Sequence, residues 1–502
     1  MSIAHRTVFA FVTAVAVPAA LTLVAGAAQA QVAKSRVTLA MVLEPPGMDP
    51  TIAPAAAIGE IVHYNVLEGL TKINVDGSVV PLLAESWAMD PDGKSYTFKL
   101  KKGIKFHDGE AFDAADVKFS FERAKDEKST NKAKKAVFDN IRRVDAPDTH
   151  TVILTLDNAD PNFLFRMGEN TAVILDAKSA AGAATKPVGT GPFTFDEWKK
   201  GTSVTLAKWA GFRDAKAVKL ERVTFRFIND PAARVAALLA GDIDGVPRLD
   251  APQAVKQLQG DQRFTVVVGS TAGKGILAIN NKKKPFDDLR VRRALAHAVD
   301  RKAFIDGVLE GQGLPIGSHF APTDAGYVDL TGVAPFDPEK AKALLKEAGV
   351  STPLSVTLTL PPPQYARKGG EVIAAQLARV GVVAKIENVE WAQWLGGAFK
   401  GNFDLTIVDH VEPLDYMQYA NTAYYWGYDN KDFRDLTAKY AATGDKKERA
   451  KLFADIQKKI AADQVNVFVF NRANVAVARK GLKGLWSSSP IAANDMAAVS
   501  WQ

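Results

Sequence analysis

The stretch from Pro81 to Arg123 constrains the fold of this chain more than any other part of it. Between Ser95 and Lys101 polar and apolar residues alternate, and this period of two is typical of a strand with one buried face. The segment Asp90–Gly93 predicts a tight turn before the strand, because proline fixes φ and glycine admits the left-handed region. Asp113 is then placed to cap a helix. The block therefore predicts strands, turns and a capped helix, with no catalytic constellation in it.

The rest of the chain carries further helix and strand signals. Asp230 and Asp337 each precede a proline at the first position of an expected helix, which is a favourable start. Gly349 can end the second of these helices in a left-handed conformation. The helix 370–380 and the following strand 382–386 predict a βαβ unit in a mixed sheet. The other expected elements are strands 37–42, 223–227, 403–408 and 465–470, and helices 55–67, 231–239 and 445–461.

Length and charge limit the class of protein. A chain of 502 residues exceeds what one hydrophobic core serves, so two or three domains are expected. The net charge is +7, and the densest basic groups are Lys282–Lys284 and the arginines within Arg290–Arg293. Val291, Leu295 and Val299 form a stripe that a helix would bury, which would leave those arginines facing outward. The sequence therefore predicts a solvated helix face here and no nucleic-acid partner.

The first 30 residues have the pattern of a secretory signal. A short basic start at residues 5–6 precedes an apolar run over 9–27, which Pro18 interrupts. Ala28–Ala30 is a small-x-small cleavage site, so the mature chain is expected to begin at Gln31. An uncleaved membrane anchor is the alternative, because a span needs about 20 apolar residues. The interrupting proline and the cleavage site favour the signal peptide.

The chain contains no cysteine. Disulfides, thiolate metal sites and a cysteine nucleophile are therefore excluded. A lipid anchor at the mature N-terminus is excluded too, because that anchor requires a cysteine. A secreted chain without an anchor is expected to be free in the periplasm.

Motifs for catalysis or metal binding are missing from the sequence. None of the seven histidines stands at metal-ligand spacing from another, and there is no HExxH. The segment around Ser270 lacks the spacing of a nucleophile elbow, and Gly189–Gly191 is followed by a proline rather than by a phosphate-loop pattern. The sequence predicts no enzyme, no metal and no cofactor.

The segment between Trp391 and Tyr428 has the most unusual composition and contains half of the ten tyrosines. Aromatic side chains suit a small-ligand cleft, although an aromatic domain core would have the same composition. The acidic loop Asp409–Asp415 follows the expected strand 403–408, and loops at strand ends often carry binding groups. The aromatic residues of the segment are Trp391, Trp394, Tyr416, Tyr419, Tyr424, Tyr425, Trp426 and Tyr428.

The Pro81–Arg123 block resembles the signature block of the family 5 extracellular solute-binding proteins, which are the dipeptide, oligopeptide and nickel receptors of ABC importers. Further blocks that are similar to those of the family follow in the family's order. They are Gly189–Phe193 with Trp198, Phe286–Arg301, and Phe336–Ala341. The resemblance covers roughly 37–486.

The resemblance implies an α/β, two-lobed periplasmic-binding-protein fold with mixed sheets, two hinge crossover strands and an extra inserted α+β domain. Crossover strands let rigid lobes close on a ligand while few dihedral angles change. After a signal peptide at 1–30, the expected parts are lobe I at 31–71, 187–275 and 476–502, an inserted domain at 72–186, and lobe II at 276–475.

The resemblance also implies a ligand site. In peptide-binding members an aspartate in this loop pairs with the α-ammonium group of the ligand, and Asp409 matches that position. A carboxylate that only braces the loop is the alternative. The segment 360–365 carries no arginine for a ligand carboxylate, which counts against a simple dipeptide clamped at both ends. The expected ligand-binding residues are Asp409, His410, Trp391, Met48, Tyr424 and Trp426.

The sequence thus predicts a monomeric periplasmic substrate-binding component of an ABC transporter. It would capture a peptide or similar small polar solute and hand it unchanged to an inner-membrane permease. A periplasmic peptide-binding chaperone or a sensor component with the same fold is the alternative.

Overall fold

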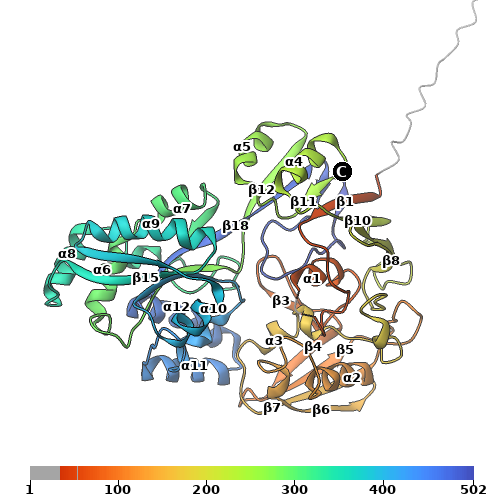
Figure 1. Ribbon diagram of the computed structural model, residues 1–502. Coiled ribbons are helices and arrows are strands. Elements are labelled where there is room, and N and C mark those ends of the chain that lie inside the picture. The colour runs from red at the N-terminus through yellow and green to blue at the C-terminus, as the bar shows by residue number, and fades with distance from the viewer. Residues whose placement is uncertain (1–33, 54) are drawn as a thin grey trace, which may run out of the picture. The chain divides into compact units, whose positions relative to one another are not determined.

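The computed structural model describes residues 34–53 and 55–502 (Figure 1). The expected signal segment and its cleavage site lie outside the described residues. Residues Ser35–Gln502 form one compact unit. Within the described ranges, none of the helices combines the length and hydropathy that a bilayer span requires.

The strands are β1 (Arg36–Met41), β2 (Thr71–Ile73), β3 (Val79–Pro81), β4 (Ala84–Met89), β5 (Ser95–Leu100), β6 (Ile141–Asp148), β7 (Thr151–Leu156), β8 (Phe193–Lys199), β9 (Ser203–Lys208), β10 (Arg222–Phe227), β11 (Gly245–Val246), β12 (Phe264–Ser270), β13 (Lys274–Ile279), β14 (Gly313–Pro315), β15 (Leu354–Leu360), β16 (Val382–Asn388), β17 (Leu405–His410), β18 (Val467–Arg479), β19 (Leu482–Lys483) and β20 (Ser500–Trp501). The α-helices are α1 (Ala56–Val62), α2 (Ala114–Lys125), α3 (Phe163–Arg166), α4 (Pro231–Ala240), α5 (Pro252–Gly260), α6 (Leu289–Ala298), α7 (Arg301–Val308), α8 (Pro338–Glu347), α9 (Gln364–Ala378), α10 (Trp391–Gly396), α11 (Lys431–Ala442) and α12 (Lys446–Asp463).

The largest sheet is mixed and has the order β16-β15-β17-β13-β18-β11-β1-β10-β9-β8, with β12 and β14 paired to β18. β15 runs parallel to β16 and β17, whereas β13 is antiparallel to both of its neighbours. The predicted βαβ unit is β15-α9-β16, and the parallel register of its two strands confirms it. This sheet carries the α/β, two-lobed periplasmic-binding-protein fold.

Strand β18 belongs to both lobes. Its first residues pair with β13 of the second lobe, and Ala473–Arg479 pair with β12 of the first lobe (Figure 1). β12 and β13 are themselves joined through Thr271–Gly273, so two chain segments cross side by side between the lobes. The expected domain boundaries near 275 and 475 fall at these crossovers, and they stay a prediction.

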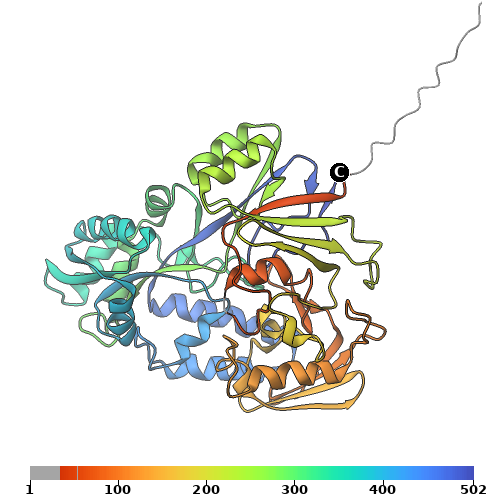
Figure 2. The same cartoon turned by 45° about the vertical axis from the view of Figure 1, so that its right-hand side comes forward.

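Separate hydrophobic cores serve the parts of the chain. Leu39, Phe193 and Phe225 belong to a core of the first lobe, and Leu358 and Phe470 to a core of the second. The inserted region has its own core, in which α2 packs against the antiparallel sheet β4-β5-β7-β6 (Figure 2).

Local capping signals are confirmed. Asp113 accepts a hydrogen bond from the amide of Ala115, and together with Asp116 it forms a capping box at α2. Asp230 and Asp337 cap α4 and α8, each with a proline in the first turn. The first predicted helix is shorter than expected, since α1 ends at Val62.

The expected orientation of the arginines on α6 is wrong for one of them. Val291 and Leu295 are buried as predicted, but Arg292 is buried as well. Its guanidinium donates to the carbonyl oxygens of Asp463 at 3.0 Å and Gln464 at 3.1 Å, at the C-terminal end of α12. Those carbonyls lack helical partners, so a buried cation there caps the helix. The apolar stripe did not predict the burial of Arg292, because α6 packs against more than one neighbouring element.

Candidate functional site

Asp409 and His410 end strand β17 and point to opposite faces of the sheet. Successive side chains of a strand alternate between faces. Asp409 lies opposite Gly275 of β13, and His410 lies opposite Lys274. The two residues, expected to share one ligand site, therefore belong to two different environments.

Asp409 forms an ion pair with Arg472 of β18, whose Nε lies 2.7 Å from its Oδ2. The Asp409 residue is only 8% exposed, while the Arg472 side chain is 47% exposed. The backbone N–H of Asp409 donates to the Tyr365 hydroxyl at 3.1 Å. Burial raises the pKa of the Asp409 carboxyl, and the positive charges of Arg472 and Lys274 oppose that shift. The carboxylate is thus desolvated, and its ion-pair partner reaches solvent.

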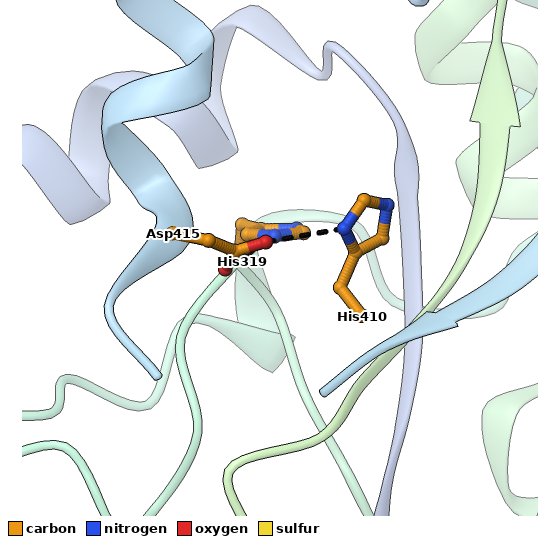
Figure 3. Close-up of side chains that lie close together, drawn as sticks. All are labelled: His319, His410 and Asp415. Carbon is orange, nitrogen blue, oxygen red and sulfur yellow. Dashed lines mark hydrogen bonds and ion pairs between the residues drawn. The ribbon is translucent and has the colours of Figure 1, made fainter. Parts of the chain in front are cut away.

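On the other face of β17, His410 belongs to a buried polar cluster. We call His319, His410, Asp415 and Lys274 the Asp415 cluster (Figure 3 shows the first three). Both histidines point at the Asp415 carboxylate, with His319 Nε2 and His410 Nδ1 each 3.1 Å from one of its oxygens. Lys274 Nζ lies 2.7 Å from Asp415 Oδ1 and donates to the Glu412 carbonyl at 2.5 Å.

The Asp415 cluster has the donor types of a metal site, and the ligand atoms of His319, His410 and Asp415 lie within 4.8 Å of one another. The Lys274 ammonium, however, already supplies a positive charge in contact with the carboxylate. His410 Nε2 lies 2.9 Å from the Tyr425 hydroxyl and Nδ1 lies 3.1 Å from Asp415, so both ring nitrogens already have protein partners. The geometry fits a carboxylate neutralised by lysine rather than a metal centre.

Charge states in the Asp415 cluster follow from burial and from Lys274. Burial lowers the pKa of His319 to about 4, so the ring is neutral at pH 7. Burial alone would raise the pKa of Asp415, but Lys274, His319 and His410 together hold it well below its usual range. The cluster at neutral pH contains the buried ion pair of Lys274 and Asp415 beside the neutral imidazole of His319.

The buried neutral histidine predicts acid sensitivity. The unfolded chain binds a proton at His319 near the ordinary pKa of 6.5, and the folded protein binds it only near 4, so stability falls as pH drops between these values. This histidine accounts for a loss of about 3 kcal/mol across that window. We expect His319→Gln, which keeps a donor toward Asp415, to lose less stability between pH 6.5 and 4.5 in urea titrations.

The His319→Gln profile keeps some slope, because burial also lowers the pKa of His63, to about 3. His150 on the protein surface provides the matched control, and His150→Gln should reproduce the wild-type profile. Wild-type and His319→Gln profiles that run parallel would contradict the assignment of the acid sensitivity to His319.

The predicted aromatic contacts occupy different positions. Trp426 is fully buried, with its ring centroid 4.5 Å from that of Tyr424, and both lie beside the Asp415 cluster. Trp391 opens α10 and is 42% exposed. Met48 is fully buried in the core of the first lobe. The six expected residues therefore do not form one cluster.

A cavity of about 310 Å³ lies in the first lobe. The loop after β1 forms one wall through Val42–Glu44, whereas Met48 of the same loop is turned into the core. Arg248 lines the cavity and pairs with Glu60 at 2.8 Å. Asn474 also lines it and stands two residues after Arg472 on β18, so both side chains leave the same face of that strand. One face of β18 thus connects the Asp409–Arg472 pair with the cavity.

Comparison with known proteins identifies the family. The model of "Bacterial extracellular solute-binding proteins, family 5 Middle" matches residues 78–433. The chain belongs to the family 5 extracellular solute-binding proteins. This family supplies the substrate-binding components of ABC importers, and that is the function of the chain.

Several relatives of this family 5 protein are known. It is 30% identical over 485 residues to the dipeptide-binding protein of Escherichia coli K12, covering 88% of this chain and 90% of the relative. It is 30% identical over 434 residues to heme-binding protein A of Haemophilus influenzae, covering 78% and 79%. The structure of HbpA2 from Haemophilus parasuis matches with a TM-score of 0.85 at 24% identity, covering 93% of this chain and 100% of that one.

Sequence reasoning about this family 5 protein missed Arg472, Lys274 and His319. Arg472 follows an apolar strand at the expected hinge, and a lone charge at that position was an available signal. Lys274 stands between two glycines before an apolar strand. His319 had no signal, because only the fold brings it to His410.

Proposed function

We propose that this family 5 protein binds a peptide, or a similar small solute with a free ammonium group, and delivers it intact to an ABC permease. The observation that carries the proposal is Asp409, a buried carboxylate at the end of β17 beside both crossover segments. A buried carboxylate needs a cation, and an ammonium group with three donors meets that need.

The names of the relatives support the peptide class. The relative in Escherichia coli is a dipeptide-binding protein, and two relatives in Pseudomonas aeruginosa are di/tripeptide-binding proteins. A solved relative from Helicobacter pylori, at 26% identity and a TM-score of 0.70, was captured with the peptide STSA. The heme-binding relative makes a tetrapyrrole the competing ligand class.

The hinge supplies the coupling between binding and transport. A ligand that contacts both lobes favours the closed form, because only that form lets both sets of contacts act at once. The cavity beside Asn474 and Arg248 provides room for the rest of the ligand in the first lobe. The permease then recognises the closed form.

The proposal also concerns the cellular location of the protein, its oligomeric state and whether it changes its ligand chemically. The signal pattern and the lack of cysteine support a chain that is free in the periplasm after cleavage, and we expect it to be a monomer. Binding without turnover is expected, since the histidines of the Asp415 cluster are held by a carboxylate and a tyrosine hydroxyl. No nucleic-acid partner is expected.

A thermal-shift screen of refolded, ligand-stripped protein tests the function. The panel contains di- and tripeptides, their N-acetylated forms, and heme. A free peptide at 100 times its dissociation constant is expected to stabilise the protein by about 2.7 kcal/mol, and its N-acetylated form should give no shift. Equal shifts from both forms would contradict the ammonium contact, and a shift from heme alone would replace the peptide class.

A further inference from the structure

We propose that Arg472 is a resident counter-ion that the ligand's ammonium group displaces from Asp409, and that the freed guanidinium then binds a carboxylate of the same ligand. Arg472 would make the site specific for solutes that carry both charges. The inference rests on the proposed function, because it assumes that Asp409 receives an ammonium group.

The pair is unequal in a way that permits exchange. Asp409 is fixed in the interior at the end of β17, whereas the Arg472 side chain is about half exposed. Nε of Arg472 forms an ion pair with Oδ2, and among the described residues neither oxygen of Asp409 accepts a hydrogen bond of good geometry. Because an ammonium group offers three donors, it can satisfy both oxygens where Arg472 contacts one. The exchange therefore adds a hydrogen bond that the resident pair lacks.

Gly273 lies against the free oxygen, which is itself buried. A Cβ at that position would lie 2.8 Å from Asp409 Oδ1 and 3.4 Å from Oδ2, which is too close for a side chain beside the first oxygen. The glycine has no positive φ, so the close approach rather than the backbone conformation requires it. At position 273 the crossover segment thus places no side chain against the Oδ1 side of the carboxylate.

The backbone of Arg472 is held by hydrogen bonds, while its side chain contacts only the Asp409 carboxylate and the Tyr365 ring among the interactions of the described residues. The Thr271 hydroxyl donates to the Arg472 carbonyl at 3.0 Å. The neighbouring Asn471 amide donates to the carbonyls of Thr271 and Gly273, both at 2.7 Å, and ties the two crossover segments together. The guanidinium carbon lies 5.7 Å from the centroid of the Tyr365 ring, over which it can turn. Exchange then requires only side-chain rotation.

The displaced guanidinium selects the second ligand group. It stays within one side-chain length of Asp409 and offers a planar fork that binds carboxylates through two hydrogen bonds. A ligand with an ammonium group alone would leave this cation unpaired beside the bound amine. A ligand with both groups restores two ion pairs, so it gains more from the exchange.

The test compares two probes on ligand-stripped protein by isothermal titration. They are L-alanyl-L-leucine and L-alanyl-L-leucinamide, which differ only in the carboxylate. We expect wild type to bind the acid more tightly. Arg472→Gln should bind the acid at least about 10-fold more weakly than wild type, as for a lost charged hydrogen-bond pair. It should bind the amide as well as wild type or better. Equal weakening of both probes, strengthening of both, or no change would overturn the proposal.

A second measurement without ligand separates the inference from the proposed function. Introduced into the wild type, Arg472→Gln should lower the melting temperature, because it breaks the ion pair with Asp409. Introduced into Asp409→Asn, it should leave the melting temperature unchanged, because that variant has already lost the pair. Additive shifts would overturn the resident pair whatever the ligand is. Coupled shifts with neither probe bound by the wild type would overturn the peptide function, and with it the exchange. Arg367→Gln, which loses only a pair with the exposed Glu390, is the control and should change neither measurement.

Discussion

Replacement of Asp409 by asparagine is expected to weaken binding of an ammonium-bearing peptide by about 2–5 kcal/mol, a factor of roughly 30 to several thousand. Asparagine keeps the size of the side chain and removes its charge. The ligand ammonium would then enter a buried site without a counter-ion and would also face Arg472, which has lost its partner. Isothermal titration with the peptide that stabilises the wild type most strongly measures the loss.

A matched control for this variant is available in the loop that follows β17. Glu412 is exposed and lies shortly after Asp409 in the sequence. Glu412→Gln removes one negative charge, as Asp409→Asn does. We expect a change in affinity below about threefold, because exposed charges are screened by solvent. An affinity for Asp409→Asn that equals that of Glu412→Gln would remove Asp409 from the site and favour the role of a carboxylate that only braces the loop.

Lys274→Met is expected to destabilise the second lobe by about 3–5 kcal/mol. The lysine side chain is 1% exposed, and its ammonium neutralises Asp415. Methionine fills a similar volume but leaves the Asp415 carboxylate buried without the lysine charge that neutralised it. The cost is therefore that of an unpaired buried charge. Chemical denaturation at pH 7, followed by tryptophan fluorescence, reports it, since Trp426 lies beside the cluster.

Two further variants decide the cause of that destabilisation. The double variant Lys274→Met with Asp415→Asn should recover most of the lost stability, because it removes both charges together. Lys431→Met breaks an exposed pair with Asp435 on α11 and should cost less than about 1 kcal/mol. If Lys274→Met proved no worse than Lys431→Met, the buried pair would not contribute to stability.

Signals that act within a few residues could be predicted from the sequence. Asp113, Asp230 and Asp337 cap helices where they were expected, because a cap depends only on the next turn of chain. The parallel pair β15 and β16 followed from a short helix between two apolar runs. The fold class followed from blocks that recur in the same order along the family.

Features that depend on distant contacts could not be predicted. Arg292 faces inward because the end of α12 offers it carbonyl groups, and nothing near α6 in sequence reveals this. His410 was expected beside Asp409, but the strand extends to residue 410 and its alternation separates the two. His319 and His410 meet only through the fold, so a search for histidine spacing could not find the cluster.

The position of β18 has a consequence for biogenesis. The sheet around β1 is completed by Val477 and its neighbours, which lie far along the chain from β1, so this sheet cannot close before β18 is available. The inserted region finishes its own four strands by Leu156 and can collapse much earlier. Long-range pairing is slow to form. Such an order of assembly lets the inserted region fold first, while the sheet of the first lobe forms only once β18 is available.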